Sequence, residues 1–264
     1  MKKLYEGVCK QIRKLFYLSK PYLSWILASL RGVKPLKAHE IPIIINNRNR
    51  YSCLKRLIAA LESRGYRNIY VIDNASTYPP LLEYYEKEYS YRLIRLEKNV
   101  GHLSLWRTGL IDRFRSNYFV YTDPDVLPIE DCPSDFLDCF LAYLKRHPFV
   151  EKVGFALKID DLPDEYDKKS QVIAWESQFW RRKSLEGNIA FYKAAIDTTF
   201  ALYRPMYIEG GFLSSPHVRV GYPYEARHLP WYNDSSCLDE EERYYLNHCE
   251  TPSHWSKGDV LRGL

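Results

Sequence analysis

The six cysteines of this 264-residue sequence include no CxxC pair and no other spacing typical of metal ligands. No signal peptide precedes them. These absences argue against a cysteine-based metal site and against a secreted disulfide scaffold, and we expect reduced thiols in the cytoplasm. The cysteines are Cys9, Cys53, Cys132, Cys139, Cys237 and Cys249.

The amino-terminal region also lacks an uncharged run long enough to span a bilayer. Its longest such run, Pro21 to Leu30, is far shorter than the roughly 20 residues that a membrane-spanning helix needs. The sequence shows no internal repeats and no low-complexity tract. With 46% hydrophobic and 27% charged residues, the chain is expected to be globular, with one large core or one core plus appendages.

Acidic residues are almost absent from residues 1–39, where nine Lys or Arg side chains accompany one acid, Glu6. This segment has a formal charge of +8, so the remaining residues carry −3 of the total of +5. A basic tail on an acidic domain argues against a core that binds nucleic acid. Tyr22 and Trp25 add aromatic bulk, which predicts a basic amphipathic segment lying on the inner face of a membrane. The alternatives are a helix packed on the domain and a contact between subunits.

Beyond this segment, short apolar runs alternate with amphipathic stretches, and residues 40–264 are expected to form one domain. The alternation predicts an α/β fold with a mostly parallel sheet flanked by helices. The expected strands are Ile41–Ile45, Asn68–Ile72, Leu93–Leu96, Tyr118–Tyr121, Val153–Lys158 and Asp197–Tyr203. The expected helices follow Ser52 and Tyr78, span Leu103–Phe114 and Val172–Lys183, and begin again at Asp239.

The most informative motif is Asp123-Pro124-Asp125, which directly follows the aromatic and β-branched run Tyr118–Tyr121. Because Pro124 ends the strand, two carboxylates lie at the carboxyl end of a core strand, where open α/β sheets bind ligands. Carboxylates spaced two apart on a turn suit a hard divalent cation that also holds a diphosphate. The three preceding strands are also followed by Asn or Asp, so the sequence predicts a binding crevice along one sheet edge.

Five short motifs follow one another along the chain. They are Asn46–Arg50, Val71–Thr77, Asn99–Gly101, Asp123–Asp125, and Arg204 together with Gly210–Phe212. In this order the sequence resembles the GT-A glycosyltransferases, specifically the family 2-like enzymes, over roughly residues 41–232. Two positions depart from the family pattern, because Asn46 stands for the usual Pro and Asn74 for an Asp. These departures leave the identity of the nucleotide base open.

The resemblance implies a nucleotide site at the ends of the first three strands. It assigns Asp73 to the base N–H, and Asn46 and Asn49 to the nucleoside pocket. It places Asn99 and Gly101 in the loop beneath the nucleotide, where glycine permits a close backbone approach. Taken without the resemblance, Asp73 also fits an Asx turn at a strand end, and Asn99 with Gly101 also fits a plain turn.

The resemblance also implies a site for Mn²⁺ or Mg²⁺. Asp125 would bind the ion directly, and Asp123 would reach either the ribose or the ion through water. His228 would be the third ligand, since a neutral imidazole suits a site shared with a carboxylate and phosphate oxygens. His217 is the rival, and a single histidine is also a common packing residue.

The general base is not fixed by the sequence, because the Glu-Asp pair that supplies it in the family has no clean match here. Three acids compete for the role. Glu225 lies nearest the family position, Asp197 begins an expected strand that borders the acceptor in related enzymes, and Glu176 lies among apolar residues that raise a carboxyl pKa.

The sequence therefore predicts a metal-dependent glycosyltransferase that takes a sugar from a nucleoside diphosphate sugar. The expected acceptor is a lipid-linked or surface glycan, as in polysaccharide biosynthesis, and the expected location is the cytoplasmic face of a membrane. A nucleotidyltransferase is the closest alternative, although the loop Asn46–Arg50 contains no glycine. A second alternative is a glycan-binding relative that has lost the activity, but the intact Asp123-Pro124-Asp125 motif argues against it. The sugar, linkage, stereochemistry and oligomeric state stay open.

Overall fold

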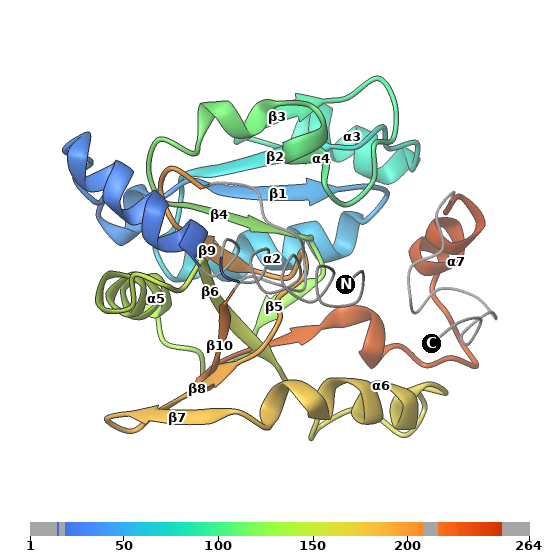
Figure 1. The fold of residues 1–264 in the computed structure, drawn as a ribbon. Coiled ribbons are helices and arrows are strands. Elements are labelled where there is room, and N and C mark those ends of the chain that lie inside the picture. The colour runs from blue at the N-terminus through green and yellow to red at the C-terminus, as the bar shows by residue number, and fades with distance from the viewer. Residues whose placement is uncertain (1–14, 16–18, 208–215, 250–264) are drawn as a thin grey trace, which may run out of the picture.

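The computed structural model of the chain describes residues 15, 19–207 and 216–249. Residues 1–14 and 16–18 of the basic amino-terminal segment and the Gly210–Phe212 motif lie outside these residues. Within them, ten strands form one sheet, in the order β3-β2-β1-β4-β9-β6-β10-β8-β7, with β5 paired to β10 (Figure 1). The expectation of an α/β fold with a mostly parallel central sheet flanked by helices is confirmed.

The first part of the sheet is parallel throughout, because each of its strands returns through a helical crossover. β1 is buried along its entire length, and its neighbours β2 and β4 are mostly apolar. The strands are β1 (Ile43–Asn47), β2 (Ile69–Asp73), β3 (Arg92–Arg95) and β4 (Phe119–Thr122). The helices between and after them are α2 (Tyr51–Ser63), α3 (Pro79–Lys87), α4 (Ser104–Arg107) and the 3₁₀ turn η2 (Leu110–Arg113).

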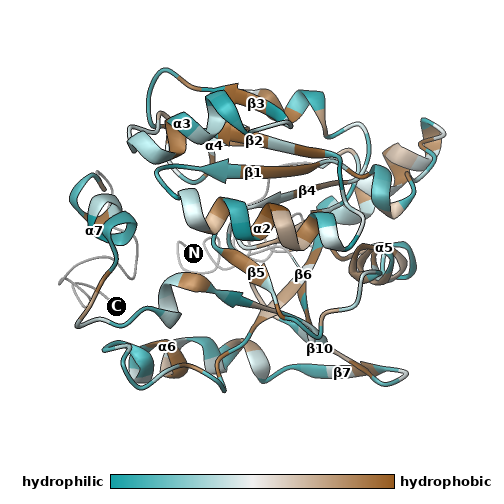
Figure 2. Ribbon diagram, turned by 180° about the vertical axis from the view of Figure 1, so that it is seen from behind, coloured by the Kyte–Doolittle hydropathy of each residue, from teal (hydrophilic) through white to brown (hydrophobic). Residues whose placement is uncertain are grey.

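Both faces of this sheet are covered, because successive side chains of a strand point to opposite faces. Ile43 and Ile45 pack in a large core with α2, α3 and α5 (Phe136–Arg146). Ile44 packs in a smaller core with α4 and η2. Figure 2 shows hydrophobic residues on the central strands and on parts of α2 and α5. This two-sided burial explains why β1 reads as a continuous apolar run.

The second part of the sheet is mixed, because β9 runs antiparallel to both β4 and β6 and joins the two parts. β10 is long and pairs with β6, β8 and β5. The strands of this second part are β5 (Val126–Pro128), β6 (Lys152–Leu157), β7 (Lys183–Glu186), β8 (Ile189–Lys193), β9 (Ala201–Tyr203) and β10 (His217–His228). The remaining elements are η1 (Ala38–Glu40), α6 (Lys169–Glu176), η3 (Ser177–Trp180), η4 (Leu229–Tyr232) and α7 (Glu240–Asn247).

Three expected elements differ from the observed ones. The helix expected over Leu103–Phe114 is broken at Gly109, whose φ of 72° lies in the left-handed region. The helix expected over Val172–Lys183 becomes α6 and η3, and Lys183 already belongs to the β7–β8 hairpin. The strand expected from Asp197 begins only at Ala201, because the preceding backbone forms an irregular segment held by side chains.

The described part of the amino-terminal segment includes helical residues 19–30, and within the described residues no helix is long and apolar enough to cross a membrane. One side of this helix is buried at Ser24 and Ala28. Tyr22 and Trp25 are exposed on the other side, and Tyr22 stacks on Phe149 with ring centroids 4.8 Å apart. The helix therefore packs on the domain and still presents aromatic rings to solvent.

Candidate donor site

A cavity of about 810 Å³ opens at the carboxyl ends of β1 and β4, as expected for ligand binding in this type of sheet. It is bounded by loops from both parts of the sheet and by α7, which lies beyond the ends of these strands in both views (Figures 1 and 2). Of the residues predicted from the sequence, the lining includes Asn46, Asn99, Gly101, Asp123, Asp125, Glu176, Asp197 and His228.

Asp123 lies at the junction between the two parts of the sheet. Its backbone N–H donates to the carbonyl of Thr198 at 3.0 Å, and the hydroxyl of Thr198 donates to its carboxylate. Burial, followed by the nearby charge of Asp125, raises the pKa of Asp123 well above its ordinary value. Asp123 and Asp125 are two positions apart and both line the cavity, and carboxylates in such an arrangement favour a shared cation or proton.

Asp125 is brought next to His228 by the pairing of β5 with the end of β10, in which Val126 lies opposite His228. The Asp125 Oδ2 and His228 Nε2 atoms are 3.8 Å apart. Burial is the main cause that lowers the pKa of His228 below its ordinary value, so the ring is neutral at pH 7. Within the described residues, Asp125 Oδ1 and His228 Nδ1 accept or donate no hydrogen bond.

These two side chains fit a divalent cation as a pair rather than as a complete cage. A carboxylate oxygen and a neutral imidazole nitrogen are suitable ligands for Mn²⁺, and diphosphate oxygens or water would fill the remaining positions. Among the described residues, no group of three or more His, Cys, Asp or Glu side chains is arranged to hold a metal ion. Asp123 accordingly lies beside the pair without completing a three-residue cluster.

The predicted nucleoside residues fall into two groups. Asn46 lines the cavity and its Oδ1 accepts from the Ser104 hydroxyl at 2.7 Å. Asn99 and Gly101 also line it, in a turn in which Asn99 Oδ1 accepts from the Gly101 N–H at 2.9 Å. Gly101 has a φ of 81°, which explains why glycine occupies this position.

Asn49 and Asp73 belong to the second group, which does not line the cavity. Asn49 Oδ1 accepts from the N–H groups of Thr77 and Tyr78, at 2.7 and 3.0 Å, just before α3 begins. Asp73 is buried and its Oδ2 accepts from the Ser76 N–H at 3.3 Å. These contacts are the local turn geometry that Asp and Asn favour at strand ends, and they shape the loops behind the cavity wall.

Asn74 lines the cavity although the sequence singled it out only as a departure from the family pattern. Its Oδ1 accepts from the Val100 N–H at 2.8 Å, and its Nδ2 donates to the Gly101 carbonyl at 3.0 Å. Asn74 therefore ties the loop after β2 to the loop that contains Asn99. An Asp at this position would lose the donor half of this contact.

The three candidate bases lie in different surroundings. Asp197 is exposed and lines the cavity. Glu176 also lines it, but its carboxylate accepts from Arg219 Nη1 at 2.7 Å in a buried ion pair. Glu225 does not line the cavity; it pairs opposite Ala156 in the sheet, and burial raises its pKa above the ordinary value.

His217, the rival to His228, lies within the core and not at the cavity. Its Nδ1 accepts from the Ile196 N–H at 3.1 Å, and its Nε2 is 3.3 Å from Glu151. Burial lowers the pKa of His217 to about 4. The ring therefore holds the backbone next to Asp197 and is a packing residue of the kind that the alternative interpretation described.

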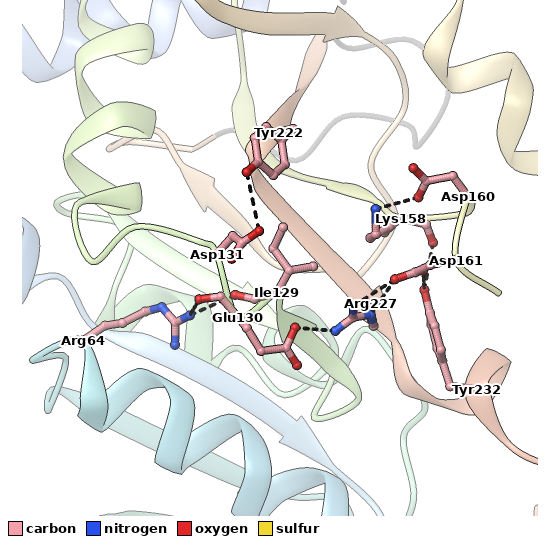
Figure 3. Close-up of polar contacts among 10 residues, drawn as sticks. All are labelled: Arg64, Ile129, Glu130, Asp131, Lys158, Asp160, Asp161, Tyr222, Arg227 and Tyr232. Carbon is pink, nitrogen blue, oxygen red and sulfur yellow. Dashed lines mark hydrogen bonds and ion pairs between the residues drawn. The ribbon is translucent and has the colours of Figure 1, made fainter. Parts of the chain in front are cut away.

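Arg227 neighbours His228 in sequence but points to the other side of β10, because side chains alternate along a strand. Its guanidinium pairs with Glu130 at 2.6 Å and with Asp161 at 2.8 Å (Figure 3). Figure 3 also shows Tyr232 donating to Asp161, and Arg64, the residue that follows α2, reaching the Glu130 backbone. This network fixes the strand that presents His228 to the cavity.

The sequence did not single out the residues that α7 contributes. Glu242, Tyr245 and Leu246 line the cavity, as do Arg48 and Arg50 from the loop after β1. A charged helix from Asp239 was expected, but no local signal tells where such a helix packs. The acidic residues of α7 and the two arginines have opposite charge, and this is the one feature of the sequence that suggests their contact.

A family model for glycosyl transferase family 2 matches residues 43–211. No curated protein matches the sequence. Among solved structures, the mannosyltransferase PcManGT from Pyrobaculum calidifontis, in complex with GDP-Man and Mn²⁺, is 12% identical, with a TM-score of 0.46, over 89% of this chain and 70% of that chain. Residues 1–349 of TarS from S. aureus are 15% identical, with a TM-score of 0.39, over 62% of this chain and 47% of that chain.

A cytidylyltransferase from Leptospira borgpetersenii serovar Hardjo-bovis is 14% identical, with a TM-score of 0.33, over 52% of this chain and 71% of that chain. The present chain thus spans about half the length of the TarS fragment and a larger share of the other two. The family match covers more than half of the chain, from β1 to the segment after β9. This protein therefore belongs to glycosyltransferase family 2 and is a glycosyltransferase with the GT-A fold.

Proposed function

We propose that this glycosyltransferase takes its sugar from a nucleoside diphosphate sugar in a reaction assisted by Mn²⁺ or Mg²⁺. The observation that carries the proposal is the cavity at the carboxyl ends of β1 and β4, with Asp123, Asp125 and His228 side by side on its wall. A diphosphate is the ligand that most needs a cation held by such a pair of side chains. Asn46, Asn74, Asn99 and the other loop residues supply polar contacts for a nucleoside.

Asp125 and His228 would hold the cation, with Asp123 beside them, and Asp123 would also reach the ribose. When bound, the cation neutralises the charge that develops on the leaving diphosphate. Asn49 and Asp73 take part indirectly in this proposal, by fixing the loops that carry the nucleoside contacts. Asp73 reaches the base only if its loop rearranges on binding.

Asp197 is the base that the arrangement favours. It lines the cavity and directly precedes Thr198, whose carbonyl and hydroxyl both contact Asp123, so Asp197 lies next to the proposed cation site. For an inverting transfer, Asp197 accepts the proton of the acceptor hydroxyl while the hydroxyl oxygen bonds to the anomeric carbon and the bond to the diphosphate breaks. Glu176 is held by Arg219, and Glu225 does not line the cavity.

The acceptor is proposed to be a lipid-linked or surface glycan, reached from the inner face of a membrane. Residues 1–39 have a charge of +8, which complements an anionic leaflet. Tyr22, Trp25 and Phe149 form an exposed aromatic cluster where this segment meets the domain, with exposed fractions of 36%, 38% and 55%. Aromatic rings beside basic residues are typical of proteins that lie in the membrane interface.

A thermal-shift screen tests the donor. UDP-, GDP-, dTDP- and CMP-sugars are added to the full chain with and without Mn²⁺, and the expected result is a metal-dependent rise in Tm with one nucleoside diphosphate sugar. The selected donor is then incubated with a glycolipid acceptor, and the released nucleoside diphosphate is measured. Stabilisation by none of the donors, with or without Mn²⁺, would contradict the proposal.

A further inference from the structure

Helix α7 is anchored to the loop that follows β1 by a buried ion pair. Both terminal nitrogens of Arg50 donate to the carboxylate of Glu242, with Nη2 at 3.2 Å from Oε1. Arg50 is 6% exposed and Glu242 is 8% exposed. Breaking a pair this buried leaves an uncompensated charge, so the pair strongly disfavours separation of α7 from the domain.

Two further contacts fix the orientation of α7. Glu241 accepts from the N–H and the hydroxyl of Ser52, at 2.8 and 2.9 Å, in the first turn of α2. Helix α2 has no side-chain cap of its own, and Glu241 fills that role. Three residues farther along the same face of α7, the Tyr244 hydroxyl donates to the Thr77 carbonyl at 3.0 Å, and its ring packs on Tyr78.

These anchors leave Tyr245 and Leu246 at the cavity, whose lining also includes Asn74 and Asn99. The Arg50 guanidinium lies 3.6 Å from the centroid of the Tyr245 ring, and both side chains line the cavity. An aromatic ring and a guanidinium plane are surfaces on which a flat heteroaromatic base stacks. The loops that carry Asn74 and Asn99 supply hydrogen-bonding groups to the same cavity.

We propose that α7 forms the outer wall of the nucleoside site, with Tyr245 and Leu246 in contact with the nucleobase of the donor. This inference rests on the proposed function, since it requires a nucleoside diphosphate in the cavity. Helix α7 lies beyond residues 43–211, so the family match does not assign it. The choice of base is then set by residues from both ends of the chain.

Isothermal titration calorimetry tests the proposal with UDP, GDP, CDP and dTDP in the presence of Mn²⁺, followed by inorganic pyrophosphate. With the nucleotide that binds best, Tyr245→Ala is expected to weaken binding at least about tenfold, the usual scale for a lost stacking partner. Tyr245→Phe keeps the ring and is expected to bind like the unaltered chain. Arg243→Ala, an exposed position on the same helix, is the matched control and is expected to change nothing.

Pyrophosphate distinguishes the nucleobase from the phosphates, because its affinity is expected to be the same in Tyr245→Ala and the unaltered chain. Equal nucleotide affinity in those two proteins would overturn the role of α7 and leave the proposed function in place. An equal loss for pyrophosphate would overturn the nucleobase contact as well. If the unaltered chain binds none of the four nucleotides, the proposed function fails and this inference fails with it.

Discussion

The two parts of the sheet divide the site between them. The parallel part, β3-β2-β1-β4, carries short-range motifs in which a strand end and the next few residues form one loop. The mixed part, from β9 to β7, places residues that are far apart in sequence next to those loops, such as Thr198 beside Asp123 and His228 beside Asp125. The parallel part therefore carries the motifs that can be recognised in the sequence. The mixed part brings Thr198 and His228 into contact with the two carboxylates of one of these motifs.

The largest expected effect is that of Asp125→Asn, which tests whether the end of the parallel part holds the diphosphate. We expect transfer to fall about a thousandfold or more, because cation stabilisation of a leaving group amounts to several kcal/mol. Donor binding is expected to weaken as well. Initial rates and calorimetry measure both quantities, with circular dichroism to verify the fold.

Asp164→Asn is the control, since Asp164 is an exposed carboxylate outside the cavity and is expected to keep full activity. Excess EDTA is expected to reduce the activity of the unaltered chain to the same extent, and added Mn²⁺ to restore it. Undiminished turnover in EDTA would contradict metal dependence.

Asp197→Asn tests the contribution of the mixed part. We expect kcat to fall about 10²- to 10⁴-fold, the usual range for loss of a general base, while donor affinity stays nearly constant. This separation of kcat from donor binding distinguishes Asp197 from Asp125. Glu225→Gln is the comparison variant, and a larger loss there than in Asp197→Asn would transfer the role of base to Glu225.

Gly154→Ala tests the packing of β6 against β9, the strand that joins the mixed part to β4, because Gly154 lies opposite Ala201 of β9. A Cβ at this position would be 2.2 Å from the Phe200 carbonyl oxygen, which belongs to the backbone and has little room to move. We expect the free energy of unfolding in urea to fall by about 3 kcal/mol, the upper part of the range for overpacking.

Gly221→Ala is the matched control, since its Cβ would approach the flexible Tyr192 side chain at 2.9 Å. Its loss of stability is expected to be smaller, and both variants are expected to unfold in one transition. Two separate transitions would indicate that the parts of the sheet fold independently.

The smallest expected effect concerns the aromatic cluster on the side of the domain. Phe149→Ser is expected to lower binding to anionic liposomes about fivefold, from roughly 1 kcal/mol of lost apolar burial. Flotation at low and high salt measures the bound fraction. Leu185→Ser, another exposed apolar position, is the control, and equal losses in both variants would argue against a specific membrane face.

The sequence predicted those parts of the site that depend on residues close together in the chain, and it missed those that depend on contacts between distant residues. β1, β2, β4 and the Asp123-Pro124-Asp125 turn were predictable, because apolar runs and a proline act over a few residues. The placement of Glu225 was not, because it depends on a register shift in β10 between Val220 and Glu225. Periodicity does not reveal such a shift, and one residue of slip moves a side chain to the other face.

Asn49 and α7 show the same limit. Asn49 lies in a cavity-forming loop, but the N–H groups of Thr77 and Tyr78 compete for its side chain, and that competition arises only once β1 and β2 are paired. The helix from Asp239 was predictable from its acidic start, and Asp239 caps it through the Glu242 N–H. Its partners on α2 are nearly 200 residues away and had no local signal.

The contact by which Glu241 caps α2 can form only late in the synthesis of the chain. Ser52 and Glu241 are separated by 189 positions, which at 5–20 residues per second corresponds to about 10–40 s of synthesis. During that interval the loop after β1 and the first turn of α2 have neither Glu241 nor Glu242. The cavity wall can therefore be completed only after translation of α7, so a nascent chain that lacks α7 also lacks part of the cavity lining.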